Sequence, residues 1–234
     1  MCGRYVLDGN LDQIAKRFEA KTDHVAGSWD WEPRYNICPT QVVPAITRDG
    51  DGDRQIVPMR WGLHPHWSKD APGEGRYGPL FNARSETAAK KPSFRTPWKR
   101  RRALIPFTHW YEWTGEQGGK VPWCIRVEDE PMTAFAGLWD CWRVDEGVEL
   151  LSCAILTTDS NGPLEQLHHR MPVRLPEEYW DDWLDVGDGG ESKGADPDML
   201  LETQLDGEDL VFWEVGRSVG NSRSRGAELI QPVA

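Results

Sequence analysis

Cysteine stands at position 2 of the sequence, directly after Met1. Methionine aminopeptidases remove Met1 when the next side chain is small, so we expect the mature chain to begin with Cys2. Its α-amine, with a reference pKa of about 7.7 to 8.0, and its thiol, at about 8.5, then each keep a nucleophilic fraction near neutral pH. Together they can trap an aldehyde, because the amine forms an imine and the thiolate closes a thiazolidine ring. The alternative is that Cys2 is only a small residue after the start codon.

Glu112 is a candidate for proton transfer to such an adduct. Its neighbours Trp110, Tyr111 and Trp113 are bulky aromatic residues on a predicted strand. Burial among them would raise the pKa of the carboxyl group toward neutrality, as an acid and base working at pH 7 requires. The alternative is a strand whose Glu112 side chain faces water.

A histidine doublet, His168 and His169, precedes a turn stiffened by Pro172. An imidazole titrates near neutral pH, so either residue is a candidate for proton transfer. Adjacent histidines seldom bind one metal ion, and there is no cysteine or third ligand at a matching spacing. We therefore expect neither a metal site nor a cofactor.

Two stretches have residue types that suit nucleic acid. The stretch from Trp61 to Trp67 interleaves aromatic residues with glycine and proline, which predicts either a rigid turn presenting a ring for base stacking or a core tryptophan pair beside a turn. Asn82 and Arg84 face the same side of an extended segment, where Asn82 can fix a carbonyl or hydroxyl and Arg84 a phosphate. Ser85, which follows, can equally be a helix cap.

The net charge of −11 and the pI near 5.0 argue by themselves against a nucleic-acid partner. The charges are segregated, however. The segment 181–209 is rich in carboxylates and has the single base Lys193. The segment 84–102 has the single acid Glu86 and is rich in bases, namely Arg84, Lys90, Lys91, Arg95, Lys99, Arg100, Arg101 and Arg102. A basic segment is thus set apart from an acidic one.

The predicted elements indicate a mixed α+β protein with a largely antiparallel sheet. Apolar residues at helical spacing predict a helix near residues 11–18 after the potential cap Asn10. Strands are predicted at 41–46 and 55–61, flanking a hairpin turn at 49–52, and at 103–107, 109–113, 121–127, 132–139 and 149–157. Helices are predicted at 177–184 and 198–203, on either side of a mobile acidic loop at 187–196.

The cysteine content indicates a reducing compartment. Five cysteines, an odd number without a C-x-x-C pair, do not suit a disulfide framework. No apolar run approaches the roughly 20 residues of a membrane span, and the N-terminus does not have the layout of a signal peptide. We expect a soluble cytoplasmic protein, associated with the nucleoid when bound to DNA, without a membrane partner.

Several motifs along the chain resemble, in their order, those of one family. They are Cys2-Gly3-Arg4-Tyr5, Arg34-Tyr35-Asn36-Ile37-Cys38-Pro39, Arg60-Trp61-Gly62-Leu63, Asn82-Ala83-Arg84-Ser85-Glu86-Thr87, Trp110-Tyr111-Glu112-Trp113, His168-His169-Arg170-Met171-Pro172, Val219-Gly220-Asn221 and Glu228-Leu229-Ile230-Gln231-Pro232. The set is similar to the SRAP family, the SOS-response-associated peptidases now understood as abasic-site processing proteins. The resemblance implies a single domain over residues 1–234, built around a barrel-like antiparallel sheet with peripheral helices. It also implies a positive groove for single-stranded DNA.

The family captures the ring-opened aldehyde of an abasic site through an N-terminal cysteine, as a thiazolidine DNA–protein crosslink that shields the lesion. The resemblance therefore implies that Cys2 is the nucleophile and that Asn82 orients the opened sugar. It implies that Glu112 assists imine formation. It selects His168, which lies two residues before Arg170, as the acid and base of ring opening and reversal. The residues expected to bind DNA are Arg4, Asn36, Trp67, Arg84 and Arg95, with Trp67 stacking near the lesion. Departures from the family pattern are the acidic segment from Asp181 onward and the histidines at positions 64 and 66.

The resemblance implies an enzyme with lyase-like and hydrolase activity that acts as a monomer on single-stranded DNA containing abasic sites, with the replication machinery as a candidate partner. Two rival classes remain open. A cysteine peptidase would use Cys2 with Glu112 and His168 to cleave amides, including a self-processing step that exposes Cys2. A non-catalytic reader of modified bases would use the same groove and would not need Cys2.

Overall fold

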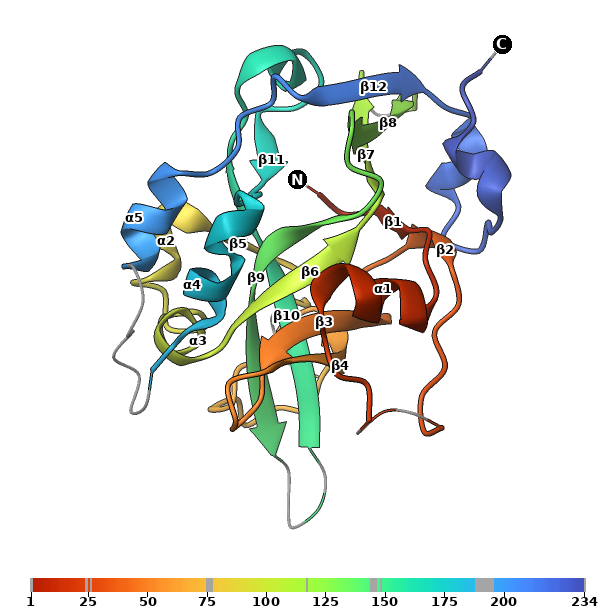
Figure 1. Cartoon of the computed structure of the whole chain (residues 1–234). Coiled ribbons are helices and arrows are strands. Elements are labelled where there is room, and N and C mark those ends of the chain that lie inside the picture. The colour runs from red at the N-terminus through yellow and green to blue at the C-terminus, as the bar shows by residue number, and fades with distance from the viewer. Residues whose placement is uncertain are drawn as a thin grey trace.

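Two β-sheets form the framework of the protein (Figure 1). The structure is a computed structural model that describes residues 2–23, 25, 27–74, 78–116, 118–143, 147, 149–187 and 196–233. The first sheet has the order β12-β8-β7-β1-β2 and is formed by β1 (Tyr5–Leu7), β2 (Arg34–Ile37), β7 (His109–Thr114), β8 (Val121–Val127) and β12 (Leu210–Glu214). The second is formed by β3 (Val42–Arg48), β4 (Arg54–Trp61), β5 (Asn82–Arg84), β6 (Arg102–Phe107), β9 (Thr133–Arg143), β10 (Glu149–Asp159) and β11 (Arg170–Pro172).

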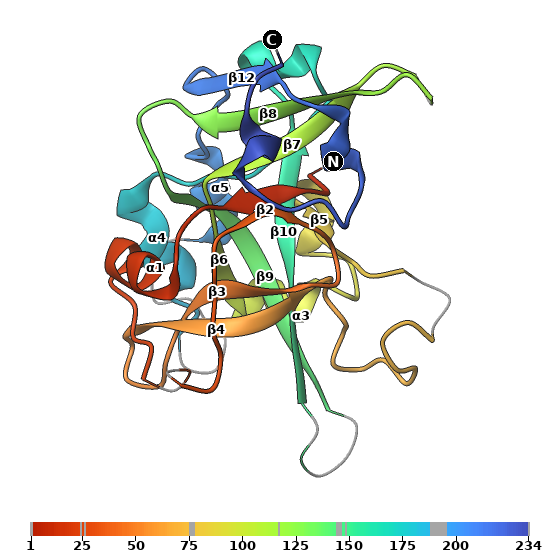
Figure 2. The same ribbon diagram turned by 90° about the vertical axis from the view of Figure 1, so that its right-hand side faces the viewer.

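The second sheet closes on itself. Its strands follow the order β10-β4-β3-β6-β9, and β9 pairs again with β10. Most pairings are antiparallel, as predicted, including the hairpin of β3 and β4. Strand β10 is the exception, because it pairs in parallel with β4 and with β5. The expected mixed α+β fold with a barrel-like sheet is therefore confirmed, and Figure 2 shows the first sheet lying beside the closed one.

Aromatic side chains fill the core. The ring of Phe107 stacks on that of Phe135 with centroids 3.7 Å apart, and Tyr5 meets Trp61 edge-on at 5.1 Å. Trp61 is fully buried, whereas 53% of Trp67 is exposed. The stretch from Trp61 to Trp67 thus begins with a core tryptophan and ends with a tryptophan on the surface.

The helices are short and peripheral. They are α1 (Leu11–Phe18), α2 (Ser85–Ala88), α3 (Arg95–Arg100), α4 (Trp180–Leu184) and α5 (Pro197–Glu202), with 3-10 turns η1 (Gly162–Gln166), η2 (Glu177–Tyr179), η4 (Arg217–Gly220) and η5 (Ala227–Ile230). Helix α1 begins as predicted, because Asn10 and Gln13 form a capping box, and it buries Ile14 and Phe18. The helix predicted at 177–184 starts with the 3-10 turn η2 and continues as α4.

Of the predicted acidic loop at 187–196, residues 188–195 lie outside the described residues. In the part of the chain that is described, there is no helix of the length and apolar character needed to cross a membrane.

Candidate active site

A cavity of about 400 Å³ lies where the residues before β1, strand β7, the turn between β7 and β8, the turn before β11 and the end of η4 meet. The described residues that line it are Gly3, Arg4, Glu112, Trp113, Lys120, His168 and Gly220. These residues come from distant parts of the sequence, so the cavity exists only in the folded chain. Two of the predicted proton-transfer residues, Glu112 and His168, line it together.

Cys2 is fully buried beside this cavity. Burial raises the pKa of the Cys2 thiol far above its ordinary value, and the negative charge of Glu112 raises it further. This finding corrects the expectation of an appreciable thiolate fraction near neutral pH, because loss of water destabilises the charged form. Within this structure the Cys2 side chain is a protonated thiol.

Asn82 holds the main chain of Cys2. Its Nδ2 atom donates a hydrogen bond to the Cys2 carbonyl oxygen at 2.8 Å. Strand β5 carries Asn82 and is itself held by β10, with Asn82 opposite Ile155. The Asn82 Oδ1 atom is also buried, and it has no hydrogen-bond donor among the described residues. A buried amide oxygen without a donor is costly, so it is suited to receive a hydrogen bond from a ligand.

Glu112 projects from β7 and is only 3% exposed. Loss of water raises the pKa of its carboxyl group to about 7. The alternative of a water-facing side chain is therefore wrong. At neutral pH both the protonated and the ionised forms of Glu112 are populated, which is what general acid and base catalysis requires.

His168 is the member of the doublet that lines the cavity, whereas His169 is exposed with its ring stacked on that of His168 at 4.4 Å. The Nδ1 atom of His168 lies 2.9 Å from the backbone nitrogen of Arg170 and 3.0 Å from its carbonyl oxygen. A neutral ring can accept from the N–H, and a protonated ring can donate to the carbonyl. Burial lowers the pKa of His168, so the imidazole is neutral at pH 7.

Arg170 joins the two segments that carry Asn82 and His168. Its side chain is 6% exposed and forms a two-pronged ion pair with Glu86, at 2.6 and 3.0 Å. It also reaches Asp159 at 2.6 Å and the carbonyl oxygen of Thr157 at 2.6 Å. Sequence reasoning assigned no role to Arg170 or Glu86, although both belong to the motifs quoted above.

Arg4 is largely committed to contacts within the protein. Its guanidinium donates to Asn36 Oδ1 at 2.7 Å and to the carbonyl oxygens of Val219 and Gly220 at 2.6 and 3.4 Å. Asn36 is 2% exposed and donates to two further carbonyl oxygens, those of Asn221 and Ser224, at 3.0 and 3.1 Å. Arg4 and Asn36, two of the five residues expected to bind DNA, thus fasten η4 and the segment after it to the first sheet.

Lys120 is a second cation at the cavity, and sequence reasoning missed it. It follows the turn between β7 and β8 and directly precedes β8. Among the described residues no salt bridge to it is formed. The glycine-rich turn before it predicts only a hairpin, so the sequence contains no signal that would have selected this lysine.

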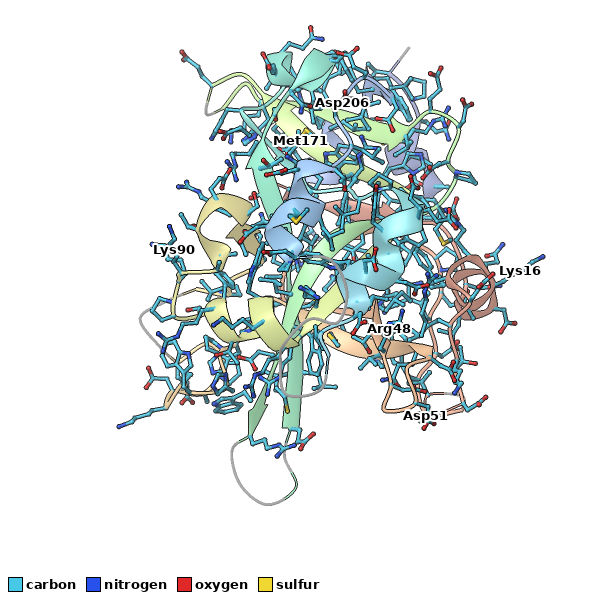
Figure 3. The ribbon with its side chains drawn as sticks, turned by 60° about the vertical axis from the view of Figure 1, so that its left-hand side comes forward. Lys16, Arg48, Asp51, Lys90, Met171 and Asp206 are labelled. Carbon is cyan, nitrogen blue, oxygen red and sulfur yellow. The ribbon has the colours of Figure 1, made fainter. Side chains whose placement is uncertain are left out.

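Trp67, Arg84 and Arg95 lie outside the set of described residues that line the cavity. Trp67 donates from Nε1 to the carbonyl oxygen of Pro92 at 3.3 Å, which places it against the basic segment that follows α2. Arg84 and Arg95 are exposed, and within the described chain neither forms an ion pair. Lys90 of the same basic segment projects from the surface (Figure 3).

In the described ranges, no group of three or more His, Cys, Asp and Glu side chains is placed to hold a metal ion. The side chains around Cys2 instead combine a thiol, an amide, a carboxyl group and an imidazole. This set can position a small carbonyl compound and move protons to and from it.

Comparison with known proteins gives matches over nearly the whole chain. Residues 1–222 match the family model described as SOS response associated peptidase (SRAP). The chain is 36% identical over 234 residues to the abasic site processing protein YoqW of Bacillus subtilis (strain 168), covering 99% of each. It is 31% identical over 237 residues to the abasic site processing protein HMCES of Pongo abelii, covering 86% of this chain and 65% of that protein.

Solved structures share the fold. A protein from Bacteroides thetaiotaomicron has a TM-score of 0.84 over 100% of both chains at 24% identity, which shows the fold alone. A protein from Bordetella bronchiseptica has a TM-score of 0.72 at 27% identity, covering 92% of this chain and 100% of that one. With the family match over residues 1–222 and 36% identity to a relative along 99% of both chains, the protein belongs to the SOS response associated peptidase (SRAP) family.

Proposed function

We propose that this protein processes abasic sites in single-stranded DNA by linking Cys2 covalently to the lesion as a thiazolidine. The observation that carries the proposal is the convergence of Asn82, Glu112 and His168 on Cys2 and its cavity. The names of the relatives, which are abasic site processing proteins, support the same lesion as the substrate.

The reaction begins with the α-amine of Cys2, exposed by removal of Met1. The amine attacks the aldehyde carbon of the ring-opened sugar, and the adduct loses its hydroxyl group as water to give an imine. Protonated Glu112 supplies the proton for that departure, which its pKa of about 7 permits near neutral pH. Departure of the hydroxyl group leaves a protonated imine and ionised Glu112. The Cys2 sulfur then bonds to the imine carbon, the thiol proton moves to the Glu112 carboxylate, and one water molecule is released overall.

The buried thiol suits this sequence of steps. Ionised Glu112 opposes a thiolate, because two negative charges in a site poor in water repel each other. Once Glu112 has donated its proton, its carboxylate can accept the proton of the thiol as sulfur attacks. The thiol therefore reacts when the imine is in place, and a stray electrophile meets a protonated sulfur.

His168 acts on the sugar. Opening of the cyclic hemiacetal requires a proton to leave the anomeric hydroxyl and another to reach the ring oxygen, and closure reverses both transfers. The Nδ1 atom of His168 contacts the backbone nitrogen and carbonyl oxygen of Arg170. We therefore assign proton exchange with the sugar to the Nε2 atom. The lowered pKa leaves a neutral imidazole ready to accept the first proton.

The DNA strand follows the basic segment 84–102, which begins with Arg84 at the end of β5. Arg84 and Arg95 contact phosphates, and Trp67 stacks on a base that flanks the lesion, since it lies against Pro92. Lys120 contacts a phosphate at the cavity itself. Arg4 and Asn36 act on DNA indirectly, by holding the segment after η4 at the rim of the cavity.

The test is incubation of the purified protein with a single strand containing one abasic site, followed by a denaturing gel. We expect a band of slower mobility that survives heating and is missing with an intact strand. Binding without such a band would contradict the proposal and favour a non-catalytic reader of modified bases.

A peptidase step is a second candidate, favoured by the family description and by the position of Glu112 beside Cys2. It would expose Cys2 by cleaving the bond that precedes it and would use the same thiol on other peptides. Replacement of Cys2 by Ile removes the thiol and retains Met1. Cleavage of peptide substrates should then stop, and cleavage that continues at the wild-type rate would rule out this role.

A further inference from the structure

The segment between β4 and β5 that carries Trp67 is fastened to β9 through His66. The backbone N–H of His66 donates to Asp140 Oδ2 at 2.9 Å, and its ring Nδ1 lies 2.8 Å from the same oxygen. Asp140 is fully buried, whereas the His66 side chain is 38% exposed. One buried carboxylate oxygen thus holds both the main chain and the side chain of the residue directly before Trp67.

Asp140 is itself held in place. Its Oδ1 atom accepts from the Arg101 guanidinium and, at 2.9 Å, from the backbone N–H of Cys141. Contacts to both oxygens keep the Asp140 carboxyl group in one orientation. Asp140 therefore offers a fixed acceptor, to which the Nδ1 of His66 donates.

Two further contacts hold the same segment on either side of His66. The backbone N–H of His64 donates to Ser152 Oγ at 2.8 Å, and Trp142 donates from Nε1 to the carbonyl oxygen of Ser68 at 2.9 Å. The ring of His64 packs edge-on against Trp142 with centroids 4.9 Å apart. The exposed indole of Trp67 therefore lies on a segment in which His64, His66 and Ser68 are each hydrogen-bonded to β9 or β10.

We propose that His66 and Asp140 are positioning residues that fix Trp67 in its stacking orientation before DNA arrives. The inference rests on the proposed function, because it takes Trp67 to stack on a base beside the lesion. It gives a role to a histidine that departs from the family pattern. A loop that is already ordered loses less conformational entropy on binding than a free one. The contacts between His66 and Asp140, called the brace below, therefore strengthen binding without touching DNA.

The central test compares the affinity of four variants for a single strand of normal bases. Trp67→Ala should weaken binding by roughly 5- to 150-fold, the range that stacking on one base is worth. His66→Ala should weaken it by roughly 2- to 12-fold, as expected if one more side chain must be ordered on binding. His66→Asn should bind like wild type, because the asparagine amide can donate to Asp140. The double variant His66→Ala/Trp67→Ala should bind no more weakly than Trp67→Ala.

That last comparison separates positioning from direct contact. If the losses of His66→Ala and Trp67→Ala add, His66 touches DNA itself and the inference is wrong. It is also wrong if His66→Ala binds like wild type, or if Trp67→Ala does. Arg143→Ala, at the exposed end of β9, serves as the control and should bind like wild type.

Hydrogen exchange measured by mass spectrometry tests the brace without DNA. The amides of residues 64 and 66–68 should exchange faster in His66→Ala than in wild type or His66→Asn, while β9 and β10 stay protected. Unchanged exchange would overturn the inference whether or not the protein crosslinks DNA. Faster exchange in a protein that binds no DNA would instead show that the proposed function has failed while the brace exists.

Discussion

The Nδ2 atom of Asn82 donates a hydrogen bond across 2.8 Å to the carbonyl oxygen of Cys2, a residue 80 positions earlier in the chain. This bond sets the position of the residue proposed as the nucleophile from its own main chain, so the thiol and the α-amine need not be used to hold it. Asn82 in turn lies on a short strand held by β10, and Arg170 joins Glu86, on the helix α2 that follows this strand, to the turn of His168. The variants below test each part of this arrangement.

Replacement of Cys2 by Ser should abolish the heat-stable adduct with abasic DNA and spare noncovalent binding. Serine keeps the α-amine and can still form an imine, but its hydroxyl closes the ring far less readily than sulfur. Borohydride should therefore trap the mutant adduct, as seen on a denaturing gel. A heat-stable adduct of undiminished yield without reductant would refute the thiazolidine.

Replacement of Arg84 by Ala should weaken binding to single-stranded DNA and reduce its salt dependence. Loss of one phosphate contact lowers the slope of log K against log salt concentration by roughly 0.7 for a single strand. Titrations at several salt concentrations measure this slope, and Arg143→Ala is the control for loss of an exposed arginine. A loss of affinity confined to particular base sequences would show that Arg84 reads bases.

Replacement of Glu112 by Gln should slow formation of the crosslink. The amide cannot deliver a proton to the departing hydroxyl, and such help is typically worth about 10²- to 10⁴-fold. Single-turnover kinetics on an abasic strand measure the loss. In wild type the rate should also fall as the pH rises through about 7, where Glu112 loses its proton, and this fall should be missing in the variant. Equal rates for both proteins at pH 6 would exclude Glu112 as the acid.

Replacement of His168 by Ala should slow reversal of the crosslink. The formed adduct should exchange onto a competing abasic strand much more slowly, because proton transfer to the sugar oxygen is lost. His169→Ala is the matched control and should exchange like wild type, since His169 is exposed, its ring stacks on that of His168, and it is not among the described residues that line the cavity. If His169→Ala slowed the exchange while His168→Ala behaved like wild type, the role would belong to His169 and not to His168.

Glu112 should also make the folded protein less stable as the pH rises. Its pKa is about 7 in the folded protein against 4.5 for an ordinary glutamate, so the folded state holds the proton more tightly. The free energy of unfolding should therefore fall between about pH 4.5 and 7, by about 3 kcal/mol from this group. Denaturant unfolding of wild type and Glu112→Gln at pH 5 and pH 8 measures it: the variant should gain relative to wild type at the higher pH. If the difference in free energy of unfolding between wild type and Glu112→Gln were the same at both pH values, the pKa of Glu112 would not be raised by folding.

Local features of the fold could be predicted from sequence because they depend on neighbouring residues. Alternating apolar residues around the turn at 49–52 specify the hairpin of β3 and β4, and Asn10 with Gln13 specifies the start of α1. The closure of the second sheet could not be predicted in this way. It depends on β10 pairing with β4, a strand far away in sequence, and parallel pairing leaves no local signal.

The candidate site likewise has features that could be predicted from the sequence and features that could not. Cys2, Asn82, Glu112 and His168 could be named from their chemistry and motifs, and the structure brings them together. The engagement of Arg4 by Asn36 could not be foreseen, since an arginine in a sequence looks available to any phosphate. The raised pKa of the Cys2 thiol was likewise hidden, because it follows from burial by residues that arrive much later in the chain.

The order in which these residues are synthesised has a consequence for the cell. Cys2 leaves the ribosome first, while Asn82, Glu112 and His168 follow at long intervals, and strand β10, which holds Asn82, is made only just before His168. A nascent or truncated chain therefore displays an unassisted cysteine. The proposed assistance by Asn82, Glu112 and His168 becomes available only when translation has passed residue 168 and the barrel has closed, so the assisted reaction belongs to the folded polypeptide and not to the nascent chain.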